Sequence, residues 1–328
     1  MNQKTSVNKI LQDLESHIQG YTYGESPKEL YEPIAYIMSL GGKRIRPLLT
    51  LLAYSLYKEN YEKALIPAAA VEVFHNFTLM HDDIMDVAPL RRGKPTVHEK
   101  WNDNTAILSG DVMLVRAYDM LLEVDHTILP KCIMLFNQTA AEVCEGQQHD
   151  MNFETMDIVG EAAYLDMIRQ KTAVLLGFAL QFGAIMAGAS EKDSNKLYEF
   201  GVNVGIGFQL KDDLLDVYAD KAKFGKQVGG DIIANKKTFL LIKAAELAKD
   251  ESKSTLEHWL EQKEFDKEEK VKAVRKIYDE LGIKALTEKK MQEYFDKGLA
   301  QLDSIDVPHK DAYQALLQIT QDLINREK

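Results

Sequence analysis

The sequence predicts an all-α protein in which roughly a dozen helices pack as a single bundle. In the C-terminal third, apolar residues recur at spacings of three and four with charged residues between them, as on one face of a helix. These residues are Val271, Val274, Ile277 and Leu281, followed by Met291, Tyr294, Phe295, Leu299 and Leu302. No stretch alternates apolar and polar residues for long enough to predict a strand, and β-branched clusters are sparse. Hydrophobic residues make up 45% of the chain, which is enough for a large core.

The chain length predicts one domain, residues 1–328. Its eight prolines are scattered, and no Pro/Gly/Ser-rich linker divides the sequence. Residues that interrupt helices mark the expected turns: Gly41-Gly42, Pro89, Gly93 to Pro95, Pro130, Gly225, Gly229-Gly230 and Pro308. The charged run from Lys249 to Glu280 is expected to be a solvated helical face.

The composition excludes several classes of protein. A formal charge of −11 argues against a nucleic-acid partner, because phosphate backbones require a basic surface. Two cysteines provide no disulfide framework and fit a reducing cytoplasm. The polar N-terminus lacks the apolar core of a signal peptide. The most apolar stretch, residues 172–189, is interrupted by Gln181 and predicts a buried core helix, with no membrane span. We therefore expect a soluble, cytoplasmic protein.

Two Asp-Asp-x-x-Asp clusters carry the chemistry of this sequence. The first cluster is residues 82–86 and the second is residues 212–216, and each follows a long apolar, helix-patterned stretch. On a helix, positions i and i+4 share one face, so each cluster presents its first and last carboxylate to the same point. The second Asp of each cluster lies about 100° around the helix.

Such carboxylate pairs predict a magnesium site that binds a diphosphate. Clustered like charges destabilise a helix unless a cation neutralises them. Mg²⁺ binds one or two carboxylates together with waters and phosphate oxygens. The alternative interpretation is that these Asp residues are solvent-exposed on a helix and bind no metal. Two such clusters, each within hydrophobic sequence, disfavour that alternative. A Ca²⁺ loop is disfavoured, because the alternating oxygen ligands and the central Gly are missing.

Basic residues beside glycine turns provide candidate anion sites. Arg91 and Arg92 follow the first cluster, and paired arginines can bind phosphate oxygens through two hydrogen bonds each. Residues 43–46 place three cations at the start of a helix, which is itself a favourable anion site, and Pro47 suits the first helical turn. Lys171, Lys226, and Lys236-Lys237 follow further along the chain. These cations indicate two anionic groups, one bound through metal and one bound by cations alone.

One histidine is a candidate for the same cavity. His75 lies seven residues before Asp82, about 20° from the same helical face. A satisfied core histidine is the alternative interpretation, and it is the one we keep for His81, His98 and His149.

Six motifs in fixed order resemble those of the trans-isoprenyl diphosphate synthases, the polyprenyl synthetase family: GGKRIRP, HDDIMDVAPLRRGKPTVH, GQQHD, KTA, FQLKDDLLD and GKQVGGD. The resemblance extends from about Leu30 to the C-terminus. It implies an all-α isoprenoid-synthase fold around a central cavity, and a homodimer. It also implies that isopentenyl diphosphate and allylic diphosphates are the substrates.

The resemblance assigns roles residue by residue. It implies that three Mg²⁺ ions on the allylic diphosphate are ligated by Asp82, Asp86 and Asp212, with Asp83, Asp213 and Asp216 in support. The allylic diphosphate would be held by Arg91, Lys171 and Lys236, with Lys226 nearby. The diphosphate of isopentenyl diphosphate would be held by Lys43, Arg46, His75 and Arg92. The reaction centre would be lined by Thr172 and Gln209, next to Lys171. Gln147 and Asp150 match the GQxxD motif, and the family's basic tail is matched only loosely by Arg326 and Lys328.

The implied mechanism is ionisation of the allylic C–O bond. Metal ions and cations stabilise the departing diphosphate, which is electrostatic catalysis aimed at charge that develops in the transition state. The double bond of isopentenyl diphosphate then attacks the allylic carbocation, and a proton is lost to the diphosphate. No Ser/His/Asp or Cys/His constellation is evident in the sequence.

The motifs disfavour two alternative functions. A class I terpene cyclase normally replaces the second cluster by an Asn/Ser/Glu-type triad and has no need for GGKRIRP. A non-catalytic subunit of a heteromeric synthase typically loses the aspartates, whereas this chain keeps all six.

Product length is predicted from the residues before the first cluster. Phe77 is five residues and Thr78 four residues upstream of Asp82. An aromatic residue at the fifth position with a small residue at the fourth resembles synthases of C15 to C20 products. We therefore expect geranylgeranyl diphosphate, with farnesyl diphosphate as the next choice and a longer polyprenyl product as the alternative.

Overall fold

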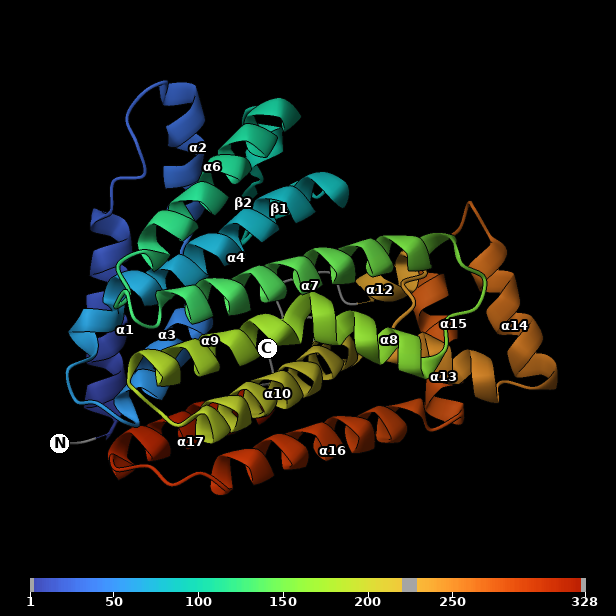
Figure 1. The fold of residues 1–328 in the computed structure, drawn as a ribbon. Helices are drawn as coiled ribbons and strands as arrows, with labels where there is room; N and C mark the ends of the chain where they lie inside the picture. The colour runs from blue at the N-terminus through green and yellow to red at the C-terminus, as the bar shows by residue number, and fades with distance from the viewer. Residues whose placement is uncertain (1–2, 220–228, 326–328) are drawn as a thin grey trace. The chain divides into compact units, whose positions relative to one another are not determined.

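A computed structural model describes residues 3–219 and 229–325. Most of this part of the chain is α-helical, which confirms the predicted all-α class (Figure 1). The α-helices are α1 (Gln3–Gly20), α2 (Lys28–Ser39), α3 (Ile45–Ser55), α4 (Leu65–Met85), α5 (Val97–Lys100), α6 (Asp103–Leu121), α7 (Leu129–Thr155), α8 (Glu161–Ile168), α9 (Val174–Met186), α10 (Glu191–Tyr218), α12 (Gly230–Ile233), α13 (Phe239–Leu247), α14 (Asp250–Glu261), α15 (Lys267–Glu280), α16 (Ile283–Asp303) and α17 (Lys310–Ile324). A 3₁₀ turn, η1 (Tyr61–Ala64), precedes α4, and a π-helical turn, η2 (Arg169–Ala173), precedes α9.

The chain divides into two compact units. Unit 1 comprises residues 1–137, 178–197 and 306–317, and unit 2 comprises residues 138–177, 198–305 and 318–328. The first acidic cluster therefore belongs to unit 1 and the second to unit 2. The single domain expected from the chain length stays a prediction.

In unit 1, α4 lies beside α6 and α3, and α2 also packs against α6 (Figure 1). The His81 ring fills the space left by Gly110, where an added Cβ would come within 2.2 Å of the ring Nε2. This Nε2 lies 3.1 Å from the carbonyl of Ile107 and donates to it. The close contact between His81 and α6 holds the end of α4 that carries the acidic cluster.

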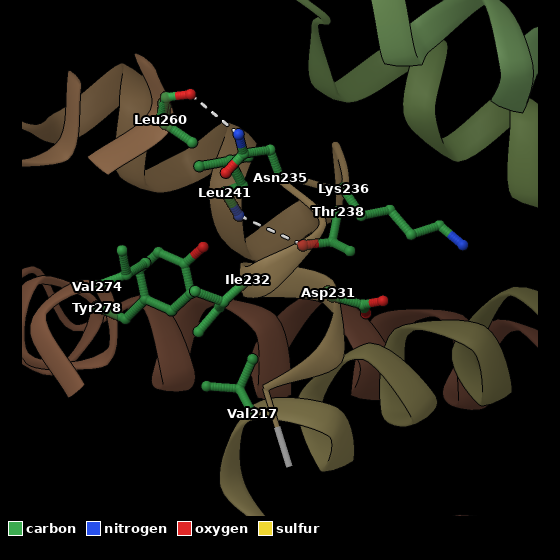
Figure 2. A pocket seen from close by; sticks show the side chains of 10 residues that line it. All are labelled: Val217, Asp231, Ile232, Asn235, Lys236, Thr238, Leu241, Leu260, Val274 and Tyr278. Carbon is green, nitrogen blue, oxygen red and sulfur yellow. Dashed lines mark hydrogen bonds between the residues drawn. The ribbon is translucent and has the colours of Figure 1, made fainter. Parts of the chain in front are cut away.

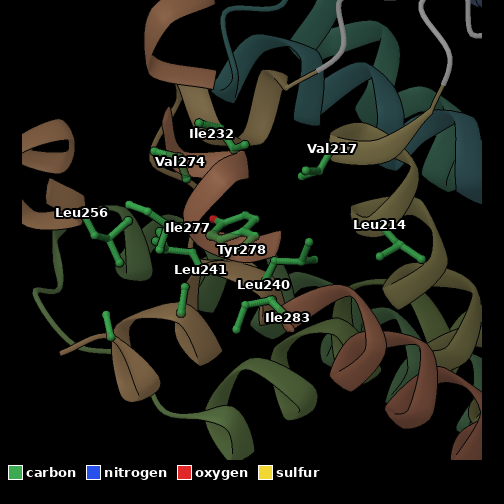
Figure 3. Close-up of a cluster of buried hydrophobic side chains, with 12 residues drawn as sticks. Leu214, Val217, Ile232, Leu240, Leu241, Leu256, Val274, Ile277, Tyr278 and Ile283 are labelled. Carbon is green, nitrogen blue, oxygen red and sulfur yellow. The ribbon is translucent and has the colours of Figure 1, made fainter. Parts of the chain in front are cut away.

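In unit 2, a core of aliphatic side chains surrounds Tyr278 (Figure 3). The core joins α10, α12, α13, α14, α15 and the start of α16. Its buried members include Leu214, Val217, Ile232, Leu240, Leu241, Leu256, Val274, Ile277 and Ile283. Since α10 carries the second acidic cluster and α12 follows it, this core supports both.

Three details bear on the sequence predictions. Helix α9 is buried along most of its length, as predicted for residues 172–189, and no helix in the described ranges has the length and apolar character that a membrane crossing requires. The segment after the first cluster forms a hairpin where we expected only a loop, with β1 (Leu90–Arg91) paired to β2 (Lys94–Pro95). The prediction that the charged run of residues 249–280 is a solvated helical face is wrong at Lys270, which is completely buried.

Candidate active site

The first acidic cluster occupies the C-terminal end of α4. Asp82 is half-buried, Asp86 is exposed and caps the helix, and Asp83 is only 3% exposed. The guanidinium of Arg91 donates to both carboxylate oxygens of Asp83, from Nε and from Nη2, each at 2.7 Å. This bidentate pair neutralises the buried carboxylate and leaves both Nη1 hydrogens of Arg91 outside the pair.

Helix α4 ends in a Schellman turn that follows the cluster directly. The amide of Val87 donates to Ile84 O at 3.2 Å, and the amide of Ala88 donates to Asp83 O at 2.9 Å. The turn requires a left-handed residue, and Val87 takes that conformation with φ 49°. A β-branched residue in this region is strained, and such strain tends to occur at functional sites.

The hairpin presents Arg92 beside the glycine turn at residues 41–42. Arg92 (φ 53°) and Gly93 (φ 74°) are both left-handed, which is the geometry of a two-residue type I′ turn. A Cβ added at Gly42 would come within 2.7 Å of the Arg92 guanidinium. The glycine therefore makes room for Arg92 next to the start of α3.

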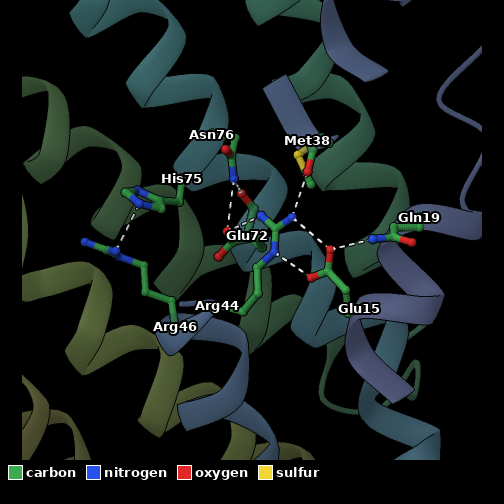
Figure 4. Close-up of polar contacts among 8 residues, drawn as sticks. All are labelled: Glu15, Gln19, Met38, Arg44, Arg46, Glu72, His75 and Asn76. Atoms are coloured by element: carbon green, nitrogen blue, oxygen red, sulfur yellow. Dashed lines mark hydrogen bonds and ion pairs between the residues drawn. The ribbon is translucent and has the colours of Figure 1, made fainter. Parts of the chain in front are cut away.

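Arg46 and His75 form a pair between α3 and α4 (Figure 4). Arg46 Nη1 lies 3.1 Å from His75 Nε2. The pKa of His75 is well below its usual value, because of burial first and then of the neighbouring positive charges of Arg46, Arg91, Arg92 and Arg44. The imidazole is therefore neutral and accepts from Arg46. The Nε of Arg46 is buried without a hydrogen-bond partner in the described part of the chain. This N–H group can therefore donate a hydrogen bond to a bound anion.

Arg44 anchors the same corner of unit 1. Its guanidinium donates to Glu15 from Nε at 2.9 Å, to Glu72 from Nη1 at 2.8 Å and to the carbonyl of Met38 from Nη2 at 2.7 Å (Figure 4). Asn76 Nδ2 also donates to Glu72 Oε1 at 3.1 Å. These contacts connect α1, α2 and α4 to the first residue before α3. Arg44 thereby fixes the backbone from which Lys43 and Arg46 project.

The second cluster lies near the end of α10. Its middle acid, Asp213, is 5% exposed and is hydrogen-bonded by two neutral groups, the hydroxyl of Tyr164 and the amide of Gln209. Burial raises the pKa of Asp213 to about 6, against the lowering effect of those two hydrogen bonds. Thr172 Oγ1 donates to Gln209 Oε1 at 3.3 Å, which orients the Gln209 amide. Thr172, Gln209 and Asp213 therefore form one connected group.

Asp216 joins the second cluster to the segment that starts at Gly229. The backbone amide of Asp231 donates to Asp216 Oδ2 at 3.0 Å, and the amide of Gly229 donates to the Asp216 carbonyl at 2.7 Å. Burial, and then the charges of Asp213 and Asp216, raise the pKa of Asp231 to about 7. This concentration of acidic groups is the environment in which a bound cation would be favourable.

Two lysines meet at Asp150 on α7. Lys171 Nζ donates to Asp150 Oδ2 at 2.6 Å, and Lys236 Nζ lies 3.8 Å from the same oxygen. Burial alone would raise the pKa of Asp150, but Lys236 and Lys171 hold it below its usual value. Lys171 projects from the π-helical turn η2, and a Cβ added at Gly146 would come within 2.2 Å of its backbone nitrogen. π-Helical turns of this kind are frequent at functional sites.

The structure gathers the predicted residues in two sets. In unit 1, Arg46, His75 and Arg92 lie close together, with Lys43 next to Arg44 on the same turn. In unit 2, a connected group comprises Asp150, Lys171 and Lys236, and a second comprises Thr172, Gln209 and Asp213. Lys226, Arg326 and Lys328 lie outside the described residues. Sequence reasoning missed Tyr164 and the anchoring role of Arg44; Tyr164 lies in no motif, whereas Arg44 stands inside GGKRIRP between two predicted ligands.

Comparison with known proteins places this arrangement in a family. The family model for polyprenyl synthetase matches residues 27–278. A geranylgeranyl diphosphate synthase from Methanosarcina mazei is 39% identical over 304 residues, which are 92% of this chain and 91% of that protein. A geranylfarnesyl diphosphate synthase from Natronomonas pharaonis is 32% identical and covers 92% of this chain and 91% of its own. A crystal structure of a geranylgeranyl pyrophosphate synthase matches with a TM-score of 0.91 at 42% identity, over 100% of both chains. The chain thus has the all-α isoprenoid-synthase fold and belongs to the polyprenyl synthetase family.

Proposed function

We propose that this protein is a short-chain trans-prenyltransferase that condenses isopentenyl diphosphate with allylic diphosphates and releases geranylgeranyl diphosphate, with farnesyl diphosphate as the next candidate product. The observation that carries this function is the pair of acidic clusters, each on a helix and each with a buried, hydrogen-bonded middle Asp. The names of the relatives favour a short-chain product over a longer polyprenyl chain or a terpene cyclase.

The donor set fits magnesium. Each cluster offers carboxylate oxygens only, and no group of three or more His, Cys, Asp or Glu side chains in the described ranges is arranged to hold a metal alone. Mg²⁺ suits such a site, because it is bound by one or two carboxylates and completed by waters and phosphate oxygens. The ligands would be Asp82, Asp86 and Asp212, for three ions. When bound, the ions neutralise the charge that the diphosphate gains as it leaves.

In this proposal, the allylic diphosphate is bound by Arg91, Lys171 and Lys236. Arg91 keeps its Nη1 hydrogens for a phosphate oxygen while its other edge holds Asp83. Lys171 and Lys236 share Asp150, which keeps two like charges close together until an anionic substrate arrives. The same lysines then provide charge-assisted hydrogen bonds to the diphosphate.

A separate set of cations in unit 1 binds isopentenyl diphosphate. Arg46 has a buried Nε without a partner in the described residues, and the neutral His75 holds its Nη1 in place. Arg92 lies beside Gly42 on the adjoining turn, and Lys43 follows that glycine. These residues provide an anion site that needs no metal, which matches the chemistry of the non-ionising substrate.

Thr172 and Gln209 face the carbocation in this proposal. Because Gln209 Nε2 donates to Asp213, its amide oxygen is directed to Thr172 and carries the negative end of the dipole there. A fixed dipole of this kind stabilises positive charge that develops at the allylic carbon. The proton released after condensation passes to the departing diphosphate.

Exposed apolar side chains support a homodimer. Residues on and just after α6 recur at spacings of seven and eight, which places them on one face. These are Ile107, Leu108, Val115 and Leu122, between 42% and 58% exposed. Exposed apolar side chains on one face of a helix are typical of an interaction surface. Analytical ultracentrifugation of the purified protein tests the dimer.

We also propose that the enzyme is located in the cytoplasm.

Phe77 is proposed to limit the product length. Its ring lies 5.7 Å from the Phe74 ring and 4.8 Å from the His81 ring, centroid to centroid, so it extends an aromatic group on α4. Thr78 donates to the carbonyl of His75 at 2.8 Å and adds little bulk. Phe77→Ala should lengthen the product by at least one isoprene unit and leave the first condensation largely intact. An unchanged product distribution in folded, active enzyme would place the limit elsewhere.

One assay tests the proposed function. The purified protein is incubated with Mg²⁺, labelled isopentenyl diphosphate and, in separate reactions, dimethylallyl, geranyl or farnesyl diphosphate. We expect extension of each allylic substrate, with C20 as the longest main product. Cyclic hydrocarbons from the allylic substrate alone, or no consumption of isopentenyl diphosphate, would contradict the proposal.

A further inference from the structure

A fully buried lysine lies behind the turn that carries Lys236. Lys270 is 0% exposed, although its neighbours along the N-terminal turn of α15 are solvated. Burial of an ammonium group is costly, and a cation near a helix N-terminus also opposes the helix dipole. Both costs need a compensating interaction.

The partners of Lys270 in the described residues are neutral. Its Nζ donates to Asn235 Oδ1 at 2.6 Å and to the carbonyl of Ile233 at 3.4 Å, and it lies 4.1 Å from the centre of the Phe265 ring. The Ile233 carbonyl is in the last turn of α12, where acceptors have no partner inside the helix and a cation is favoured. Lys270 thus caps α12 from a different helix.

Asn235 is the residue that this cap controls. It is left-handed, with φ 54°, and forms a Schellman turn in which its own amide donates to Ile232 O at 3.2 Å. The second bond of the turn runs from the amide of Lys236 to the carbonyl of Asp231, at 2.9 Å. The Asn235 side chain also donates from Nδ2 to Leu260 O at 3.0 Å. Asn235 therefore connects α12 to both α14 and α15.

The turn fixes Lys236 on both sides. After it, the Thr238 amide donates to the Lys236 carbonyl at 2.8 Å, and Thr238 begins α13 as its N-cap. Asn235, Lys236 and Thr238 line a pocket with room for about one water molecule, and Figure 2 shows the Lys236 side chain extending away from it. The backbone of Lys236 is held from the core side, while its side chain reaches Asp150, with Nζ 3.8 Å from Oδ2.

We propose that Lys270 is a positioning residue, which fixes the Asn235 turn and thereby places Lys236 for diphosphate binding. The inference rests on the proposed function. It differs from a role in stability alone, because the hydrogen bonds of Lys270 go to the turn itself, and Lys270 is not one of the residues of the aliphatic core around Tyr278 (Figure 3).

Two variants and one matched control test the inference. Lys270→Met keeps most of the side-chain volume and removes the donors. Asn235→Gly keeps a residue that adopts φ 54° readily and removes the side-chain bridge, so it replaces Lys270→Met if that variant does not fold. Lys272→Met changes an exposed lysine on the same helix. The double variant Lys270→Met/Asn235→Gly should lose less than the sum of the two single losses, because both changes remove the hydrogen bond between Lys270 and Asn235.

The measurements separate positioning from stability. For Lys270→Met we expect amide hydrogen exchange in residues 229–238 to rise on the order of 10-fold, with the rest of unit 2 unchanged. We expect KM for the allylic substrate to rise about 5- to 20-fold, while KM for isopentenyl diphosphate stays within about 2-fold of wild type. A role in stability alone would instead lower the active fraction, leave both KM values in place and raise exchange throughout unit 2.

A binding measurement keeps this test independent of the reaction. Calorimetry with Mg²⁺ and inorganic pyrophosphate should show about 5- to 20-fold weaker binding for Lys270→Met than for Lys272→Met. If wild type does not condense substrates but this difference and the exchange difference appear, the proposed function fails and the positioning role stands. If Lys270→Met matches Lys272→Met in exchange and in pyrophosphate affinity, the positioning role is wrong.

Discussion

The two acidic clusters share one sequence pattern but differ in how their middle Asp is held. Asp83, in the first cluster, is neutralised by the permanent charge of Arg91. Asp213, in the second, is hydrogen-bonded by the hydroxyl of Tyr164 and the amide of Gln209, and burial raises its pKa to about 6. The middle Asp of the first cluster is therefore held by a bidentate ion pair, whereas the middle Asp of the second is held by two neutral hydrogen bonds, and the charge of Lys236 also lowers its pKa.

The last Asp of each cluster differs as well. Asp86 caps α4 at an exposed position and is followed by the strained Val87. Asp216 lies within α10 and accepts a hydrogen bond from the Asp231 amide. One terminal carboxylate thus remains at a helix end, while the other organises the next segment. Repetition of a motif therefore does not imply repetition of roles.

The largest expected effect comes from removal of a proposed metal ligand. Asp82→Ala and Asp212→Ala should each lower kcat by at least about 1,000-fold, because each removes a ligand from ions that stabilise the leaving group. Steady-state assays at saturating Mg²⁺ measure this. Asp157→Ala, at an exposed position outside both clusters, is the control and should resemble wild type. Retention of more than about a tenth of the activity by either cluster variant would contradict the metal assignment.

Loss of the partner of each middle Asp tests the comparison directly. Arg91→Met leaves a buried carboxylate without its counter-charge and should lower the free energy of unfolding by about 3 kcal/mol. Tyr164→Phe removes one neutral hydrogen bond, while Gln209 remains, and should cost about 1–2 kcal/mol. Urea unfolding of metal-free protein gives both values. If Tyr164→Phe cost more than Arg91→Met, the contrast between the two clusters would be wrong.

The double variant Asp83→Asn/Arg91→Met sharpens this test. Removing the carboxylate charge together with its partner should recover most of the stability that Arg91→Met loses. A double variant as unstable as Arg91→Met alone would mean that the loss comes from packing of the arginine stem.

These contrasts were only partly predictable from sequence. Helical periodicity and the i, i+4 spacing predicted the helices and the shared face of each carboxylate pair, because both follow from helix geometry. The pairing of Arg91 with Asp83 depends on the type I′ turn at Arg92 and Gly93, which a loop prediction does not include. Tyr164 and Asp213 are 49 residues apart, and no local pattern connects them.

The burial of Lys270 was also not predicted from the sequence. Lys270 stands among charged neighbours in the first turn of α15, on the same face as the apolar residues Val274 and Ile277. Its burial depends on the Asn235 turn packed opposite it, 35 residues earlier in the chain. The sequence pattern of a helix indicates which residues share a face, but the elements packed against that face decide whether a lysine is solvated.

The two diphosphate sites should respond separately to loss of a cation. Arg46→Ala removes a guanidinium paired with His75 and should raise KM for isopentenyl diphosphate much more than KM for the allylic substrate. Lys236→Ala should do the reverse. A charge-assisted bond is worth about 2–3 kcal/mol, or roughly 30- to 150-fold in kcat/KM for the affected substrate. Equal effects on both substrates would refute this allocation.

The smallest expected effect concerns the strain at the end of the first cluster. Val87 is 73% exposed, so its side chain contributes little burial, and its left-handed backbone costs on the order of 1–2 kcal/mol. Val87→Gly removes that strain but increases the entropy of the unfolded chain, which offsets about 0.5–1 kcal/mol. We expect a net gain of about 0.5–1 kcal/mol in the free energy of unfolding, measured by urea titration. Val87→Ala keeps the left-handed penalty but loses the β-branch, and should lie between wild type and Val87→Gly. If Val87→Gly were less stable than Val87→Ala, the turn after Asp86 would be unstrained, and the two clusters would differ only in how their middle and last Asp residues are bound.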